Sequence, residues 1–149
     1  MSTPVRVLFV DDDPIILRAM ARALGNEDFE VYFTDDAERV PELLGELRID
    51  IIVSDEDMPG QRGLEMLALV RKLHAQSIRI LLSGMADTAP FRQGLSDGVI
   101  HHFVGKPWSV QELRTLLRGA VEGVRDAKDA LAQRTRGTGS FRRRIDIAA

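Results

Sequence analysis

The feature that most constrains this chain is a strict alternation of short apolar runs with segments of helical periodicity. Five apolar runs of strand length follow one another: Val5–Val10, Phe29–Phe33, Ile49–Ser54, Ile78–Leu82 and Ile100–Val104. Apolar residues recur every three or four positions in the segments between and after them: Ile15–Leu24, Val40–Leu47, Leu64–Leu73, Thr88–Leu95 and the chain from Val110 onward. Strands that alternate with helices pair in parallel through right-handed crossovers, so helices cover both faces of the sheet. The sequence therefore predicts an α/β domain.

Composition narrows the class of protein and of partner. The chain has 149 residues, enough for one ordinary domain, and its 44% apolar and 29% charged content is typical of globular proteins. A net charge of −3 argues against a nucleic-acid partner and a membrane surface. The sequence has no cysteine, which excludes disulfides and thiolate chemistry. Because the first residues do not resemble a signal peptide and no apolar run approaches the ~20 residues of a membrane span, we expect a cytoplasmic location.

Polar side chains follow four of the predicted strands at the point where each strand ends. They are Asp11 and Asp12 after the first strand, Asp55 after the third, Ser83 after the fourth and Lys106 after the fifth. The carboxyl ends of parallel strands share one edge of a sheet, where open α/β sheets bind ligands. Two carboxylates ~4 Å apart repel by about 4 kcal/mol at an effective dielectric constant near 20, so three of them call for a cation or for protonation.

The residue types at this edge favour phosphoryl transfer. Mg²⁺ suits a set of carboxylate oxygens best, with Mn²⁺ as the alternative ion, and it also coordinates phosphate oxygens. A lysine and a hydroxyl opposite the acids would bind an oxyanion. A carboxylate nucleophile, a metal, a lysine and a serine together make a site for an aspartyl-phosphate intermediate. The neighbouring Asp13 is explained more simply, because Asp13–Pro14 has the sequence of a helix start.

Four motifs carry a resemblance to a known family. They are "VDD" at 10–12, "DEDMPG" at 55–60, "SG" at 83–84 and "KP" at 106–107. With these motifs in this order and spacing, the chain resembles a response-regulator receiver domain, the phosphoacceptor part of a two-component system, over about residues 5–120. The resemblance implies a flavodoxin-like, doubly wound sheet of five parallel strands in the order 2-1-3-4-5, with helices on both faces.

The resemblance also implies a role for each acidic residue. Asp55 would be the phosphoacceptor, because Met58 and Pro59 follow it at the third and fourth positions. Asp11 and Asp12 would hold the metal together with Asp55. The backbone carbonyl of Asp57 would be a further metal ligand.

Three other residues occupy positions to which the family gives a role in switching. Lys106 would pair with the phosphoryl oxygens, and its bond to Pro107 would be cis. Ser83 would be the hydroxyl that moves toward the phosphoryl group. Phe103 would be the aromatic switch, and the surface formed by the fourth helix, the fifth strand and the last helix would then change its partner.

The resemblance implies a histidine kinase or phosphotransfer protein as the phosphoryl donor. The chain would be a switch that catalyses only its own phosphorylation and dephosphorylation. Two alternatives stay open. A haloacid-dehalogenase-like phosphatase also uses an Asp nucleophile with a second Asp two positions on, as Asp55 and Asp57 are, but it needs further acids after a later strand. A scaffold that is never phosphorylated is the other alternative.

The last predicted helix extends past the usual end of a receiver. A capping box at Ser109–Glu112 starts it. Its apolar seam has heptad spacing and consists of Val110, Leu113, Leu117, Ala120, Val124, Ala127 and Leu131. We divide the chain into a receiver domain (1–120), an extension of the last helix (121–133) and a flexible basic tail (134–149). The extension either pairs with a second copy in a homodimer or lies on its own domain.

Overall fold

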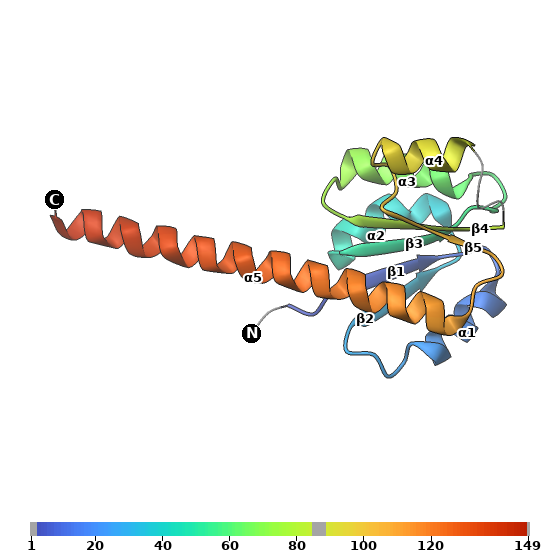
Figure 1. Cartoon of the computed structure of the whole chain (residues 1–149), viewed down its shortest axis with the longest axis horizontal. Coiled ribbons are helices and arrows are strands. Elements are labelled where there is room, and N and C mark those ends of the chain that lie inside the picture. Colours follow the sequence, from blue (N-terminus) through green and yellow to red (C-terminus); the bar gives the residue numbers. More distant parts are fainter. Residues whose placement is uncertain (1–2, 85–88, 149) are drawn as a thin grey trace.

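A sheet of five parallel strands forms the centre of the chain (Figure 1). The structure is a computed structural model that describes residues 3–84 and 89–148, with side chains as far as Arg134. The strands are β1 (Arg6–Val10), β2 (Glu30–Thr34), β3 (Ile51–Asp55), β4 (Ile78–Ser83) and β5 (His102–Gly105). Their spatial order is β2-β1-β3-β4-β5, which confirms the predicted flavodoxin-like topology. The chain changes its direction of winding between β1 and β3, where such sheets bind their ligands.

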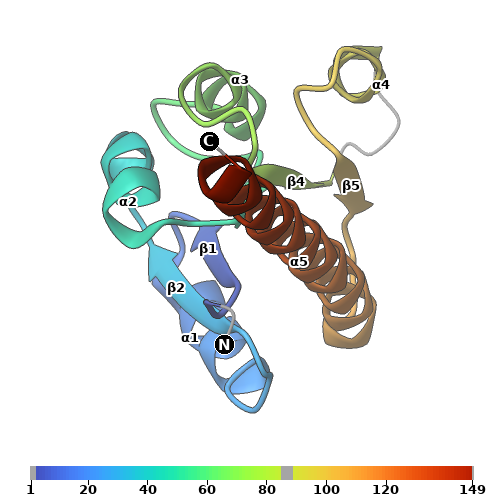
Figure 2. The same cartoon turned by 90° about the vertical axis from the view of Figure 1, so that its left-hand side faces the viewer.

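Helices cover both faces of the sheet. They are α1 (Pro14–Ala23), α2 (Val40–Leu47), α3 (Gly63–Leu73), α4 (Ala89–Ser96) and α5 (Val110–Ala148), with a short 3₁₀ helix, η1 (Ala37–Arg39), before α2. Helices α1 and α5 lie on one face, and α2, α3 and α4 lie on the other (Figures 1 and 2). All five predicted helices are therefore present.

Strand β1 shows why both faces have to be covered. Val7 and Phe9 pack into the core beneath α1 and α5, whereas Leu8 and Val10 pack into the core beneath α2, α3 and α4. All four side chains are buried. A strand that is apolar on both sides is typical of the middle of a parallel sheet, and this is the position of β1 between β2 and β3.

The start of α1 is the one expected from its sequence. The Asp13 carboxylate accepts a hydrogen bond from the Ile15 N–H at 2.9 Å, and Pro14 is the first residue of the helix. Asp13 is thus a helix cap, as predicted, and this leaves Asp11 and Asp12 for another role.

Strand β5 begins later than predicted. The apolar run suggested a start at Ile100, but the strand starts at His102. The N–H groups of Val99 and Ile100 donate to the carbonyl of Gly94 at 2.8 and 3.2 Å, so they close the end of α4 and do not pair with β4. Ile100 remains buried, which explains why it belongs to the apolar run.

Helix α5 extends far beyond the sheet. Leu113, Leu117 and Val121 are buried against the sheet, so core contacts reach past residue 120. The backbone is helical to Ala148, and the flexible tail expected from Arg134 stays a prediction. No proline follows Pro107, so the sequence has no strong helix breaker there. The side chains of the predicted basic tail beyond Arg134 lie outside the described residues.

None of the helices in residues 3–84 and 89–148 combines the length and the apolar character needed to span a membrane.

An arginine is buried where the sequence suggested an apolar strand. Arg79 of β4 is only 3% exposed. Its guanidinium donates to carbonyls of two loops, reaching Ser77 at 2.9 Å in the loop before β4, and Val99 and Gly98 at 2.7 and 3.0 Å in the loop before β5. Burial lowers its pKa. One side chain thus ties together two loops at the amino end of the sheet.

We expect Arg79→Leu to lower the free energy of unfolding by about 2–4 kcal/mol, because the buried carbonyls lose their donor. The matched change at an exposed position, Arg18→Leu, should alter it by no more than about 0.5 kcal/mol. Urea unfolding of both variants and the parent measures this. Equal midpoints for the two variants would contradict the assigned role.

Candidate functional site

The polar residues that follow the strands meet at one edge of the sheet. Asp11 comes directly after β1, Asp55 ends β3, Ser83 ends β4 and Lys106 follows β5. Because the strands are parallel, these ends lie side by side in space although 95 positions of sequence separate Asp11 from Lys106.

Three carboxylates form the centre of the site. Oxygen atoms of Asp11, Asp12 and Asp55 all lie within 4.8 Å of one another. Asp11 and Asp55 are buried, whereas Asp12 is exposed. Burial raises the pKa of Asp11 to about 6, and the charges of Asp55 and Asp12 add to this increase, although the N–H of Asp13 donates to the Asp11 carboxylate at 2.9 Å and opposes it.

The donor set fits a small divalent cation. Carboxylate oxygens that repel one another are the ligands that Mg²⁺ prefers, and a cation among them would offset the repulsion that adds to the effect of burial on the pKa of Asp11. In the part of the chain that the structure describes, this trio is the group of acids close enough to share an ion. Asp57 is exposed in the loop after β3, and the role of its backbone carbonyl stays a prediction.

A lysine faces the acids. The Lys106 ammonium donates to Asp55 Oδ1 at 2.6 Å. Burial lowers the pKa of Lys106, but the hydrogen bond and the charge of Asp55 outweigh it, so the pKa lies above its ordinary value and the side chain stays charged. The bond from Lys106 to Pro107 is cis, as the resemblance implied.

Ser83 lies next to this lysine, and Phe103 lies within β5, three residues before the lysine. Ser83 is fully buried, and its carbonyl accepts a hydrogen bond from the Lys106 N–H at 2.8 Å. The half-buried ring of Phe103 packs on Phe91 of α4, with 5.3 Å between ring centroids. The structure thus places Ser83 in the site and Phe103 against α4. Their roles in switching stay predictions.

Two residues that the sequence analysis did not single out hold the loop after β3. Glu56 is 3% exposed, and its carboxylate accepts a hydrogen bond from the Leu64 N–H at 2.8 Å, which caps α3 from eight residues away. A Cβ at Gly63 would collide with the Asp55 carbonyl oxygen, so only glycine allows α3 to approach this closely. The "G" eight positions after Asp55 was visible in the sequence. The cap by Glu56 could not be seen in the sequence, because the carboxylate lies eight residues before the N–H that it caps.

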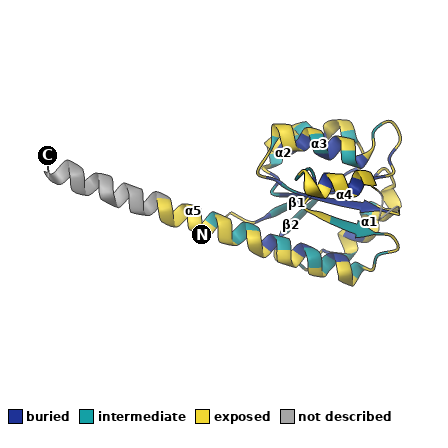
Figure 3. Cartoon of the chain, turned by 45° about the horizontal axis from the view of Figure 1, so that its top comes forward, coloured by how far each residue is buried: buried dark blue, intermediate teal, exposed yellow. Residues whose placement is uncertain are grey.

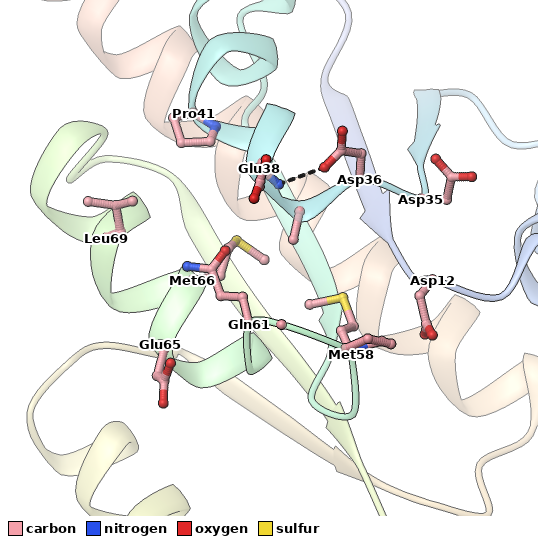
Figure 4. A pocket seen from close by; sticks show the side chains of 13 residues that line it. Asp12, Asp35, Asp36, Glu38, Pro41, Met58, Gln61, Glu65, Met66 and Leu69 are labelled. Atoms are coloured by element: carbon pink, nitrogen blue, oxygen red, sulfur yellow. Dashed lines mark hydrogen bonds between the residues drawn. The ribbon is translucent and has the colours of Figure 1, made fainter.

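A pocket of about 700 Å³ adjoins Asp12 (Figure 4). It lies between the start of α2, the loop after β3 and α3. Five acids line it: Asp12, Asp35, Asp36, Glu38 and Glu65. The bond drawn in Figure 4 runs from the Glu38 N–H to the Asp36 carboxylate at 3.0 Å and caps η1. Together with the carboxylate trio, these acids give this side of the site a negative field, which attracts cations.

Known proteins with the same features are response regulators. The family model for the response regulator receiver domain matches residues 7–118. The hydrogenase transcriptional regulatory protein HoxA of Cupriavidus necator is 34% identical over 116 residues, which are 78% of this chain and 24% of HoxA. The transcriptional regulatory protein TrcR of Mycobacterium tuberculosis is 30% identical over 118 residues, which are 79% of this chain and 46% of TrcR. The chain therefore spans less than half of these relatives.

A solved structure agrees with these matches. The signal receiver domain of an HD domain-containing protein from Pseudomonas fluorescens superposes with a TM-score of 0.76 at 27% identity. The superposition covers 87% of this chain and 95% of that domain.

We expect Asp11→Asn to stabilise the metal-free protein by roughly 1–3 kcal/mol at pH 8, because it removes a buried charge and keeps the oxygen that accepts from Asp13. The pKa of Asp11 is raised from 3.8 to about 6, so its ionised form destabilises the fold increasingly as the pH rises between these values. The gain should therefore shrink as the pH falls from 8 to 5. Urea unfolding in a chelator measures it, with the exposed Asp35→Asn as control. A gain that does not depend on pH would contradict this explanation.

The cap on α3 leads to a further prediction. Burial raises the pKa of Glu56, while the bond from Leu64 lowers it. Glu56→Gln keeps an oxygen acceptor and removes the buried charge, so we expect it to be at least as stable as the parent at pH 8. Glu56→Ala leaves the Leu64 N–H without its acceptor and should lose about 1–2 kcal/mol relative to Glu56→Gln. Thermal and urea unfolding compare the two variants, and equal stability would mean that the cap contributes nothing.

Proposed function

Because this chain belongs to the response-regulator receiver family, we propose that Asp55 accepts a phosphoryl group from a phosphohistidine of a kinase or phosphotransfer protein. The observation that carries the proposal is the pairing of Lys106 Nζ with Asp55 Oδ1 at 2.6 Å beside the carboxylates of Asp11 and Asp12. A nucleophile, a fixed cation and ligands for a metal thus lie within one small volume.

The chemistry follows from these positions. A carboxylate oxygen of Asp55 attacks the phosphorus, the new O–P bond forms, and the N–P bond breaks, with its electron pair returning to the imidazole of the donor. The Lys106 ammonium stabilises the negative charge on the phosphoryl oxygens. Asp11, Asp12 and Asp55, with the backbone carbonyl of Asp57, would hold Mg²⁺, which would supply additional charge neutralisation. Hydrolysis later releases inorganic phosphate and restores Asp55.

The surface around the site suits a protein donor. Ile15, in the first turn of α1 next to the acids, is 66% exposed, and the adjacent Ile16 is 36% exposed. Exposed large apolar side chains beside a polar site are typical of protein contacts. Together with the single-turnover chemistry of an aspartyl phosphate, this favours a phosphoprotein donor over a small substrate.

Phosphorylation would act on the rest of the chain through Ser83 and Phe103. The hydroxyl of Ser83 moves toward the phosphoryl oxygens, and the ring of Phe103 leaves its contact with Phe91 for the space that Ser83 vacates. The surface formed by α4, β5 and α5 changes as a result, which shifts the population between two partner-binding states.

The phosphatase alternative is not favoured. A haloacid-dehalogenase-like site needs further acids after a later strand, but β4 ends in Ser83 and β5 is followed by Lys106. The presence of the complete set of acids, hydroxyl and lysine also argues against a scaffold that is never phosphorylated.

We expect the protein to gain one phosphoryl group on incubation with acetyl phosphate and Mg²⁺, and to gain none when a chelator replaces Mg²⁺. Asp55→Asn should gain none under any condition, because it lacks the nucleophile. Intact mass measures the gain, and the fluorescence of Trp108, which follows Pro107, reports its time course. The same samples should not turn over a phosphomonoester. A parent protein that gains no phosphoryl mass from any competent donor would favour the scaffold, and repeated turnover would favour the phosphatase.

A further inference from the structure

A large groove lies at the edge of the sheet opposite to Asp55. Its volume is about 1080 Å³, and it is bounded by the carboxyl ends of α2 and α3, the start of β5 and one side of α5. Figure 2 views this edge, where α5 runs past the sheet toward the viewer. The groove is thus separate from the phosphoryl site, and α5 is its longest wall.

The wall formed by α5 is mostly apolar, and two glycines leave part of it without side chains. Its residues include Leu116, Gly119, Ala120, Gly123, Val124 and Ala127. A Cβ at Gly119 or Gly123 would meet nothing within 4 Å. Glycine costs about 0.8–1 kcal/mol in a helix interior relative to alanine, so two glycines on the same side weaken the helix without any need from the domain itself. A flat side of this kind allows another helix to approach closely.

Helix α5 continues well past its contacts with the domain. Lys128 still reaches the domain, where its ammonium donates to Asp50 at 3.1 Å. The backbone then continues as a helix to Ala148, away from the sheet (Figure 1). Figure 3 shows α5 changing from buried to exposed along this path, and Leu131 is 65% exposed. A long helix with an apolar side is stabilised mainly by packing against a partner.

We propose that the groove holds α5 of a second copy of this chain, with the two helices parallel. Each helix would lie along the Gly119–Gly123 side of the other and enter the groove of the other domain. The proposal concerns assembly and does not depend on phosphorylation of Asp55.

The distribution of charge selects this occupant and its direction. At about 100° per residue, the side of α5 that lines the groove is rotated by about 100° from the side that packs on the sheet, Leu113, Leu117 and Val121. Counted from Leu117, the centre of the sheet-packing side, the exposed acids Glu122 and Asp126 are rotated by about 140° and about 180° in the opposite sense, so they point away from the sheet of their own domain.

This geometry distinguishes parallel from antiparallel pairs. A two-fold axis along parallel helices turns the acids of the partner toward this domain. There Arg48, His74 and His102 line the wall of the groove. An antiparallel pair turns the acids away from that wall. The guanidinium of Arg48 therefore meets the acids of the partner only in the parallel arrangement.

Cysteine cross-linking tests the arrangement, because the chain has no native cysteine. In a parallel pair in register, residue 127 faces its own copy across the interface. We expect Ala127→Cys in the full chain to form a disulfide-linked dimer under mild oxidation. Asp129→Cys lies on the outer side of the same helix and should form at least tenfold less of the disulfide-linked dimer. Equal cross-linking at both positions, or more at residue 129, overturns the proposal.

Size measurements by sedimentation and light scattering provide a second test. We expect a dimer for the parent and for Asp55→Asn, with or without phosphoryl donor. The double variant Gly119→Gln/Gly123→Gln fills the flat side and should be a monomer, whereas Gly119→Ala/Gly123→Ala keeps the side flat and should remain a dimer. Both double variants should remain folded, since glutamine and alanine favour helix over glycine.

Charge reversal tests the direction of the pair. Arg48→Glu and Asp126→Lys should each weaken the dimer at least tenfold, and the two changes together should restore it. A parent that is monomeric at all concentrations overturns the proposal. A dimer that persists in the glutamine variant also overturns the proposal, because that dimer must use another surface. The proposal is overturned as well if the groove binds a helix of another protein and no second copy of this chain.

Discussion

The site depends on the mutual repulsion of carboxylates at one edge of the sheet. The positive charge of Lys106 reduces this repulsion. Asp11, Asp12 and Asp55 would not lie this close without a nearby positive charge. The ammonium at 2.6 Å from Asp55 supplies part of that charge. The pKa of Asp11 is still raised, mainly by burial and further by the charges of Asp55 and Asp12. A folded protein accepts this electrostatic cost only when the rest of the structure is rigid enough to hold the groups in place.

That rigidity comes from backbone contacts around the loop after β3. Gly63 lets α3 approach the Asp55 carbonyl, and the Glu56 carboxylate caps the same helix. On the other side, the Ser83 carbonyl accepts a hydrogen bond from the Lys106 N–H, which ties the lysine to β4. The nucleophile and its counter-charge are therefore both held by contacts with the ends of neighbouring strands.

Periodicity and strand ends are local properties of the chain, so they were sufficient to predict the parallel sheet and the convergence of Asp11, Asp12, Asp55 and Lys106. The strand order followed from the resemblance to receiver domains. The sequence was not sufficient for Arg79, whose partners lie in two loops distant in sequence and whose burial interrupts an apolar strand. The cap provided by Glu56 was missed for the same reason. The boundary of β5 was displaced because Ile100 is buried by the end of α4 and not by strand pairing. Contacts of this kind depend on tertiary structure and leave no periodic pattern.

Helix α5 begins three residues after Pro107 and runs without interruption across the whole depth of the sheet to the far edge. With 39 residues it is ~58 Å long. A tilt of about 5° at its first turn, where it adjoins Lys106, would displace its far end by about 5 Å. The length of the helix therefore converts a small change of tilt near the acids into a movement of several ångströms at its far end.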